Sequence, residues 1–271
     1  PTGYPLLSHP KYRDEDLEKF IKEFKHIVSH NPKIDLNKYG PGWAWDDYNS
    51  YYQAERSEMP IYGNVVQIIK NSNGEIEVTP NIYKIIFDFE QKNKRLRSEK
   101  ENKFFINPSL IKFGDTIYSP FITSRKNTIS LLENSLGNKV EFKKDELKDY
   151  NTLNTTQSNK IYSAILKDSD LISDSRAANI SLRLNDTISV DKGVRLIQNI
   201  SKQIELFDGS GLSRYNLVTP KSVISSLHDI YNLIGFDRIK KIFPKNYIIQ
   251  NEKDFVWGKT GTLRNNHNYS G

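Results

Sequence analysis

The sequence contains no cysteine and a single methionine among its 271 residues. Without cysteine the chain has no disulfide bonds, no cysteine-ligated zinc and no thiol catalysis. It also lacks any apolar run close to the roughly 18 residues that a membrane-spanning helix needs. No signal peptide is visible, which says nothing about export because we do not expect Pro1 to be the native first residue. Hydrophobic residues make up 37% of the chain and charged residues 27%, which is typical of a globular protein.

Basic residues exceed acidic residues, with 39 lysines and arginines against 33 aspartates and glutamates and a net charge of +6. The lysines are scattered along the chain. No basic stripe interleaved with aromatic residues and no nucleic-acid-binding motif is present, so we expect no nucleic-acid partner. A basic surface favours the anionic polymers of a cell envelope instead.

The first half of the sequence predicts one helix followed by short strands. Apolar residues recur at three- and four-residue spacing over residues 14–30, which predicts an amphipathic helix. Asn73-Gly74 is a strong hairpin signal. We expect residues 129–136 to continue in the same β-like style. The β-like runs are residues 65–69, 76–78, 84–87 and 103–106.

The second half predicts mostly helices and one late strand. Residues 157–160 are polar and are interpreted as a linker. Helical periodicity then covers residues 161–172, 190–204 and 220–233, the last with Pro220 in its first turn and Gly235 close after its end. The apolar run 255–257 leads into a strand that carries Lys-Thr-Gly.

Two short segments of the second half carry the chemistry. Lys259-Thr260-Gly261 offers a cation for a carboxylate and a glycine that lets another backbone approach a strand edge. This tripeptide alone is a weak signal in a lysine-rich chain. About fifty residues earlier lies the sequence DGSGLSR at 208–214, whose two glycines permit a tight turn and which we expect to be mainly structural. The two segments together make a specific pattern.

Three segments, in this order along the chain, resemble the D-alanyl-D-alanine carboxypeptidase/endopeptidase family of low-molecular-mass penicillin-binding proteins. They are residues 39–49 with 54–64, residues 208–220 and residues 259–271. Gly-Tyr-Pro at 3–5 and Ser-His-Pro at 8–10 stand where the family has Gly-Asp-Pro and His-Pro. Asn-Asn-His-Asn at 265–268 resembles the Bacteroidetes branch of the family.

The resemblance implies an α/β fold, a transpeptidase/β-lactamase-like domain interrupted by a β-rich insertion domain. Residues 1–155 would be the insertion region and residues 156–271 the C-terminal half of the transpeptidase-like domain. The chain would then be truncated at both ends, with the nucleophile helix before Pro1. The implied activity is serine acyl transfer on peptidoglycan stem peptides, with β-lactams as ligands and no metal or cofactor. The implied location is the periplasm or cell envelope.

The resemblance also assigns the third family motif to Lys259-Thr260-Gly261. Lys259 would bind the terminal carboxylate of the substrate and support the serine of the second motif. Thr260 would hydrogen-bond the same carboxylate, and the backbone N–H of Thr262 would contribute to the oxyanion hole.

The second family motif, Ser-Asp-Asn, is altered. The preferred alignment places Ser173 as a catalytic residue and Ser175 in the substrate-binding position of the asparagine, because Ala178 then matches a family alanine. The rival alignment uses Ser-Asp-Leu at 169–171. In either alignment the asparagine is absent. The simpler interpretation is that these residues are no longer a functional motif and only form the capped start of a helix.

The first family motif, Ser-x-x-Lys, has no good candidate. Three matches occur, which is what chance gives in such a chain, and none falls at the family position: Ser8/Lys11, Ser109/Lys112 and Ser189/Lys192. We therefore expect the nucleophile upstream of the sequence. The alternative is a catalytically inactive relative that serves as a binding or scaffold subunit in an envelope complex.

Two further features leave alternatives open. Trp43, Trp45, Asp46 and Asp47 fit a carbohydrate-binding or metal-binding loop, although we favour a loop packed against the catalytic domain because two adjacent aspartates make a poor metal site. His26 and His30 would lie one helical turn apart, a spacing that metal ligands also use. No third ligand is evident, so we expect surface or core histidines.

Overall fold

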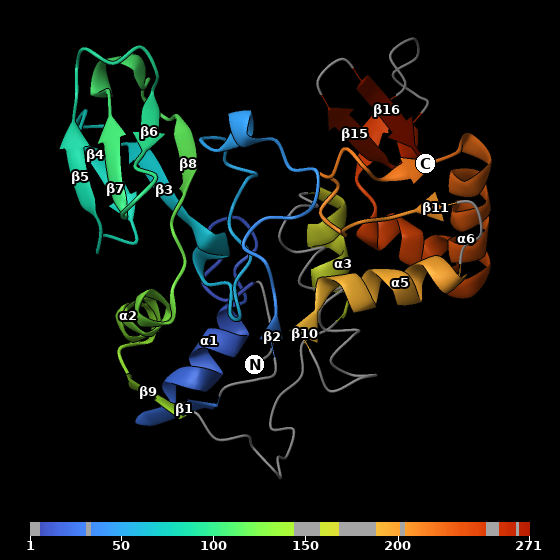
Figure 1. The fold of residues 1–271 in the computed structure, drawn as a ribbon, viewed down its shortest axis with the longest axis horizontal. Helices are drawn as coiled ribbons and strands as arrows, with labels where there is room; N and C mark the ends of the chain where they lie inside the picture. Colours follow the sequence, from blue (N-terminus) through green and yellow to red (C-terminus); the bar gives the residue numbers. More distant parts are fainter. Residues whose placement is uncertain are drawn as a thin grey trace. The chain divides into compact units, whose positions relative to one another are not determined.

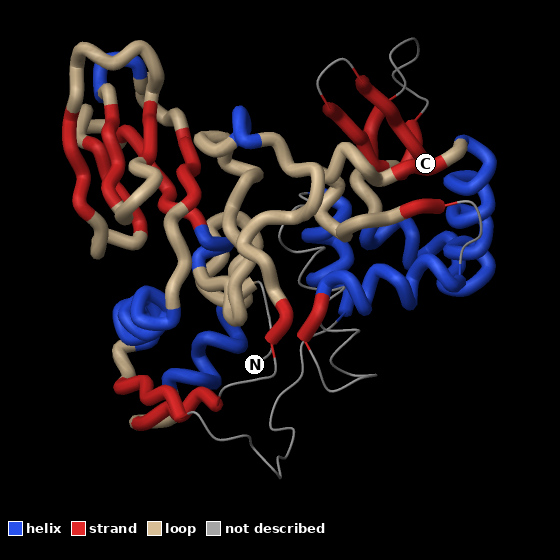
Figure 2. Tube along the Cα trace, in the orientation of Figure 1, coloured by secondary structure: helices blue, strands red, loops and turns tan. Residues whose placement is uncertain are grey.

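The computed structural model describes residues 6–30, 34–143, 158–167, 188–200, 204–247, 255–263 and 266–271. The chain divides into two compact units (Figures 1 and 2). Unit 1 contains Pro1–Tyr39 and Ala44–Asn151, and unit 2 contains Gly40–Trp43 and Thr152–Gly271. That unit 1 is an insertion and unit 2 half of a transpeptidase-like domain, divided at 155/156, stays a prediction. In the described ranges no helix is long and apolar enough to cross a membrane.

Unit 1 contains two three-stranded sheets, and all four predicted β-like runs are strands in them. The antiparallel sheet has the order β4-β3-β8, and the mixed sheet has the order β5-β7-β6 with β5 parallel to β7. The predicted turn joins β3 to β4, and Gly74 supplies the positive φ of 82° that it needs. The bounds are β3 Val65–Lys70, β4 Ile76–Thr79, β5 Lys84–Phe87, β6 Arg95–Arg97, β7 Lys103–Ile106 and β8 Thr116–Pro120.

A hydrophobic core fills unit 1. Alternate residues of β3 and β7 point inward, so that Ile68 and Phe104 are almost fully buried. Full burial of one such side chain stabilises the fold by roughly 1.5–3 kcal/mol. The core consists of Leu7, Met59, Ile61, Val66, Ile68, Phe104, Ile106, Ile111, Phe121, Leu131, Leu132, Leu136 and Val140.

The predicted helix over residues 14–30 is wrong in its second half. Helix α1 covers Glu15–Lys22. Asp14 caps its start, because its side chain accepts a hydrogen bond from the N–H of Leu17 at 3.3 Å. His26–His30 forms strand β1, parallel to β9 at Lys139–Lys143. Local periodicity cannot reveal this pairing, because the partner strand lies far along the chain. The two histidines are therefore not one helical turn apart.

The prediction of β-like structure at residues 129–136 is also wrong, because they belong to helix α2, Arg125–Leu136. Ser124 caps its start by accepting from the N–H of Asn127 at 3.1 Å. Gly137 ends it in the left-handed conformation, with φ of 73°. These two caps mark the ends of a helix, which the apolar pattern alone does not indicate.

Unit 2 contains the predicted helices, with some changed ends. Helix α3, Ser158–Lys167, begins inside the segment interpreted as a linker, and residues 168–172 of the predicted helix lie outside the described residues. Helix α5, Val190–Ile200, ends before residue 204, which opens a strand. Helix α6, Pro220–Ile242, begins as predicted and continues beyond a kink at Gly235. The short strands are β11 Ile204–Glu205, β12 Leu217–Val218, β13 Lys245–Tyr247, β14 Phe255–Trp257, β15 Lys259–Leu263 and β16 Asn266–Ser270.

Candidate active site

The Lys-Thr-Gly motif lies on a β-hairpin of unit 2, formed by strands β15 and β16 (Figure 1). The strands are antiparallel, with Lys259 opposite Ser270 and Gly261 opposite Asn268. Among the strands that the structure describes, β15 pairs with β16 alone. Its other edge therefore presents backbone N–H and C=O groups to which an extended peptide can add.

Two glycines fix the base of this hairpin. A Cβ atom at Gly258 would overlap the backbone oxygen of Ser270, and a Cβ atom at Gly271 would overlap that of Trp257. The N–H of Gly258 also donates to the carbonyl of Pro244 at 3.0 Å. At the base of the hairpin the two backbone segments thus lie so close together that there is no space for a side chain at Gly258 or Gly271.

Gly261, the glycine of the motif, is different. Among the described residues, a Cβ atom there would meet only Cβ of Asn268, at 4.0 Å, and its φ lies outside the left-handed region. Neither packing nor backbone conformation requires glycine at this position. The absence of a side chain keeps the exposed face of the strand free for a molecule outside the hairpin.

The polar side chains of the motif are accessible. Nζ of Lys259 donates to the carbonyl oxygen of Thr260 at 2.8 Å, and the Thr260 side chain is exposed. Oγ1 of Thr262 lies 2.9 Å from Nδ1 of His267 on the facing strand. The sequence analysis did not anticipate this cross-strand pair, because it depends on the hairpin register.

The second-motif candidates Ser173 and Ser175, and the alternative at 169–171, lie outside the described residues. That Lys259 supports Ser173 therefore stays a prediction.

The first Ser-x-x-Lys match, Ser8 with Lys11, has its two side chains engaged elsewhere. Oγ of Ser8 is hydrogen-bonded to Oγ of Ser135. Nζ of Lys11 lies 4.9 Å from the ring centroid of Tyr51 and 5.0 Å from that of Tyr118. These are structural contacts, and they support the expectation that this pair is a chance match.

The other two matches also use their hydroxyl groups locally. Oγ of Ser109 donates to Oδ1 of Asn107 at 2.5 Å. Ser189 is 1% exposed and accepts from the N–H of Lys192 at 3.2 Å, which caps the start of α5. A serine buried in this way is a poor candidate nucleophile, because a substrate cannot reach it.

The loop at residues 208–216 is organised around the carboxylate of Asp208, which is 1% exposed. The carboxylate accepts hydrogen bonds from Nε1 of Trp43 at 2.5 Å, from Oγ of Ser210 at 2.8 Å and from Nδ2 of Asn216 at 3.1 Å. Three donors on one buried carboxylate fix the conformation of the loop.

The same loop holds the short segment Gly40–Trp43. Oγ of Ser213 donates to the carbonyl of Pro41 at 2.6 Å. Gly42 has φ of 75°, and a Cβ atom there would lie 3.0 Å from the Tyr215 ring. These contacts show that Trp43 is packed, as expected, and fit the mainly structural role predicted for residues 208–214; that it packs against a catalytic domain stays a prediction.

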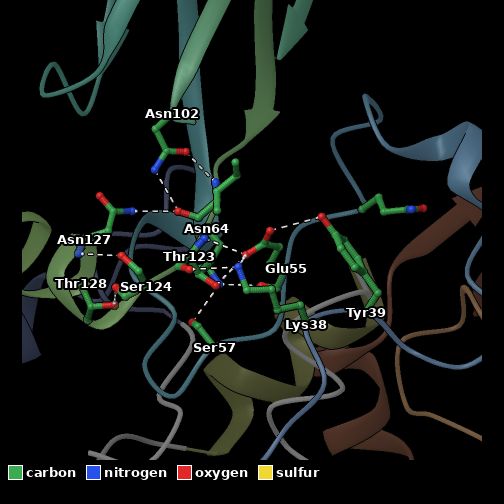
Figure 3. Close-up of polar contacts among 12 residues, drawn as sticks. Lys38, Tyr39, Glu55, Ser57, Asn64, Asn102, Thr123, Ser124, Asn127 and Thr128 are labelled. Carbon is green, nitrogen blue, oxygen red and sulfur yellow. Dashed lines mark hydrogen bonds and ion pairs between the residues drawn. The ribbon is translucent and has the colours of Figure 1, made fainter. Parts of the chain in front are cut away.

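The resembling segment at residues 54–64 forms a buried polar network in unit 1 (Figure 3). Glu55, 3% exposed, accepts from the N–H and from Oγ1 of Thr123, both at 2.7 Å, and lies 3.0 Å from Nζ of Lys38. The hydroxyl of Tyr39 donates to Glu55 at 3.3 Å, and burial raises the pKa of Tyr39 to about 12. Nδ2 of Asn64 donates to the carbonyl of Glu55 at 2.7 Å. The network holds this segment in place.

No family model and no curated protein matches this chain. Among solved structures, the chain is similar to the crystal structure of penicillin-binding protein 4 (dacB) from Haemophilus influenzae, with a TM-score of 0.68 and 18% sequence identity. The match covers 100% of this chain and 71% of that chain. The mixed α/β structure thus matches part of a penicillin-binding-protein fold, as predicted. At this identity the likeness shows the fold alone.

Proposed function

We propose that the protein is a serine-type D-Ala-D-Ala carboxypeptidase or endopeptidase that acts on peptidoglycan stem peptides in the periplasm or cell envelope. The observation that carries this proposal is the exposed Lys259-Thr260-Gly261 strand, whose glycine has space that its own fold does not use. The likeness to the fold of penicillin-binding protein 4 supports it. We also propose that the protein comes from the Bacteroidetes branch of this family.

The residues of β15 supply binding and orientation in this proposal. Lys259 exchanges its bond to the Thr260 carbonyl for a charge-assisted bond to the terminal carboxylate of the peptide. The Thr260 hydroxyl adds a second donor to that carboxylate. The peptide backbone lies along the free edge of the strand, and the N–H of Thr262 donates to the developing oxyanion.

The covalent step is ordinary acyl transfer, with the nucleophilic serine in a Ser-x-x-Lys segment upstream of Pro1. The serine oxygen attacks the carbonyl of the penultimate residue, the peptide bond breaks, and the terminal amino acid leaves with the proton that the serine lost. Water then hydrolyses the acyl ester and restores the serine. Ser173 relays protons between the serine and the leaving amine.

A second candidate function is favoured by the altered second motif. With Ser175 or Leu171 in place of asparagine, the site loses an amide that both donates and accepts hydrogen bonds. A relative that binds stem peptides without turnover, as a subunit of an envelope complex, fits this loss.

Labelling of the full-length protein with a fluorescent penicillin tests the proposal. We expect covalent labelling that excess unlabelled β-lactam blocks. Lys259→Ala should abolish labelling, whereas Lys221→Ala, which changes an exposed lysine of α6, should not alter it. Ser175→Asn should raise the acylation rate roughly ten- to a hundredfold, because a lost hydrogen bond of this kind costs about 1–3 kcal/mol. Folded wild-type protein that is never labelled would contradict the enzyme and favour the binding subunit.

A further inference from the structure

Trp45, in the short 3₁₀ helix Trp45–Asp47 of unit 1, presents an aromatic ring to solvent. Its side chain is 61% exposed, in contrast to the hydrogen-bonded Trp43 two residues earlier. The ring stacks on that of Tyr48, with centroids 4.9 Å apart and planes inclined by 26°. The ring is therefore supported from within the protein and open elsewhere.

The ring beneath Trp45 is buried and hydrogen-bonded. Tyr48 is 6% exposed, and its hydroxyl donates to the carbonyl of Ser98 at 2.9 Å. Cζ of Arg97 lies 3.7 Å from the Tyr48 ring centroid, and Nε of Arg97 donates to the Tyr48 carbonyl at 2.8 Å. Trp45, Tyr48 and Arg97 thus form a stacked column anchored to strand β6. A ring held in this way loses little conformational freedom when it binds a ligand.

Two aspartates follow Trp45 in the 3₁₀ helix. Asp46 is exposed, whereas Asp47 accepts a hydrogen bond from the hydroxyl of Tyr52 at 2.8 Å. Nε2 of Gln53 donates to the carbonyl of Ala44 at 2.8 Å, which closes the turn that carries these residues. The described residues contain no group of three potential metal ligands. Asp46 is thus better suited to accept hydrogen bonds from hydroxyl groups than to hold a cation.

We infer that Trp45 is a stacking platform for a neutral pyranose ring of a glycan, with Asp46 accepting hydrogen bonds from the sugar hydroxyls. The C–H face of a pyranose is apolar and matches an aromatic face, while its rim of hydroxyl donors matches a carboxylate. Two adjacent aspartates repel anionic ligands, which favours neutral sugars over acidic peptides or nucleic acid. The inference holds whether or not the proposed acyl transfer occurs.

Titration of the full-length protein with chitotetraose tests the inference, followed by tryptophan fluorescence and saturation-transfer NMR. We expect Trp45→Ala to weaken binding about tenfold and Asp46→Asn to weaken it less, since a stacking contact of roughly 1.4 kcal/mol corresponds to a factor of ten. Phe113→Ala is the matched control, because Phe113 is 74% exposed but lies outside the column. This variant should bind as the wild type does.

Saturation transfer from the wild-type protein to the sugar ring protons is a readout that needs no variant. Wild-type protein that shows neither transfer nor fluorescence change at millimolar sugar would overturn the inference. Affinity that survives Trp45→Ala, or that falls equally in Phe113→Ala, would also overturn it. Trp45-dependent binding of an acidic peptide but not of the sugar would show that the platform serves a protein partner instead.

Discussion

The two units of this protein bury different kinds of side chain. Unit 1 encloses large apolar residues, such as Phe104 at 1% and Leu131 at 0% exposure. In unit 2, the buried side chains in the described ranges are mostly small or polar, and large apolar ones lie open, with Leu217 60% and Leu233 84% exposed. The buried set of unit 2 is Ala164, Ser189, Val190, Val194, Asp208, Ser210, Ser213, Ser222 and Ile242.

This difference indicates two sources of stability. A buried leucine contributes roughly 1.5–3 kcal/mol, whereas a hydrogen bond contributes a net of about 1 kcal/mol. Unit 1 depends on its core. In the described part of unit 2, where the proposed catalytic strand lies, we expect a larger share of the stability to come from the hydrogen bonds around Asp208 and from the close backbone contact at Gly258.

Two leucines in helices provide the most direct test of this comparison. Leu131→Ala in α2 should lower the free energy of unfolding by about 2–5 kcal/mol, because it leaves a cavity in the core. Leu233→Ala in α6 should change it by no more than about 0.5 kcal/mol, because the side chain is exposed. Denaturant titration measures both. A large loss in Leu233→Ala would show that the apolar face of unit 2 is covered in solution.

The second test removes the carboxylate at the centre of the unit 2 loop. Asp208→Ala should lower the free energy of unfolding by about 2–3 kcal/mol, because it removes the carboxylate that accepts from the indole N–H of Trp43 and from the hydroxyl of Ser210. Thermal and denaturant unfolding give the measurement, and the exposed Asp46→Ala is the control. If both variants were equally stable, the hydrogen bonds of the Asp208 loop would not be a main source of the stability of unit 2.

The third test separates the two glycines of the β15–β16 hairpin. Gly258→Ala should cost about 1–3 kcal/mol, because the new methyl group overlaps the backbone of Ser270. Gly261→Ala should leave the unfolding midpoint unchanged, because its neighbour is 4.0 Å away, but should reduce labelling by penicillin. Unfolding and labelling of the same samples distinguish a structural role from a binding role. Gly261→Ala with full labelling would remove the observation on which the proposed function rests.

The elements set by local patterns were predictable from the sequence, and those set by distant contacts were not. The four alternating runs and the Asn73-Gly74 turn of unit 1 are found as expected, because strand period and turn chemistry are local. Strand β1 was missed because β9, its partner, is remote in sequence. Helix α2 was missed because its apolar residues pack on the core without a clear helical period, and the caps at Ser124 and Gly137 were overlooked.

The candidate site was predictable only as a motif. Lys259 and its neighbours were identified from their sequence, and the structure adds that they share an exposed edge strand. The bond from Trp43 to Asp208 joins residues 165 positions apart, and no local signal marks it. The contact between Gly258 and Gly271 likewise depends on the hairpin register. The sequence therefore identified the residues of the motif but not the residues that hold the motif in place.

The smallest expected effect concerns pH. It sharpens the comparison because, among the described residues, the tyrosines whose pKa is raised by burial lie in unit 1: Tyr39, Tyr48, Tyr62 and Tyr83. Tyr39 has a pKa of about 12 in the folded protein against 10.0 for the free group. Between these values the unfolded chain releases the phenol proton and the folded chain keeps it, so stability falls as pH rises from 10 towards 12. Tyr39→Phe removes this dependence.

The wild type should therefore be more stable than Tyr39→Phe at pH 8, by the hydrogen bond that Tyr39 donates to Glu55, and this advantage should shrink steadily above pH 10. Urea unfolding midpoints of the two proteins, measured in parallel from pH 8 to 11.5, give the difference directly. The other tyrosines are common to both proteins and cancel in it. A difference that stays constant over this range would mean that the Tyr39 phenol is not buried in solution, and that the network around Glu55 is looser than the core beside it.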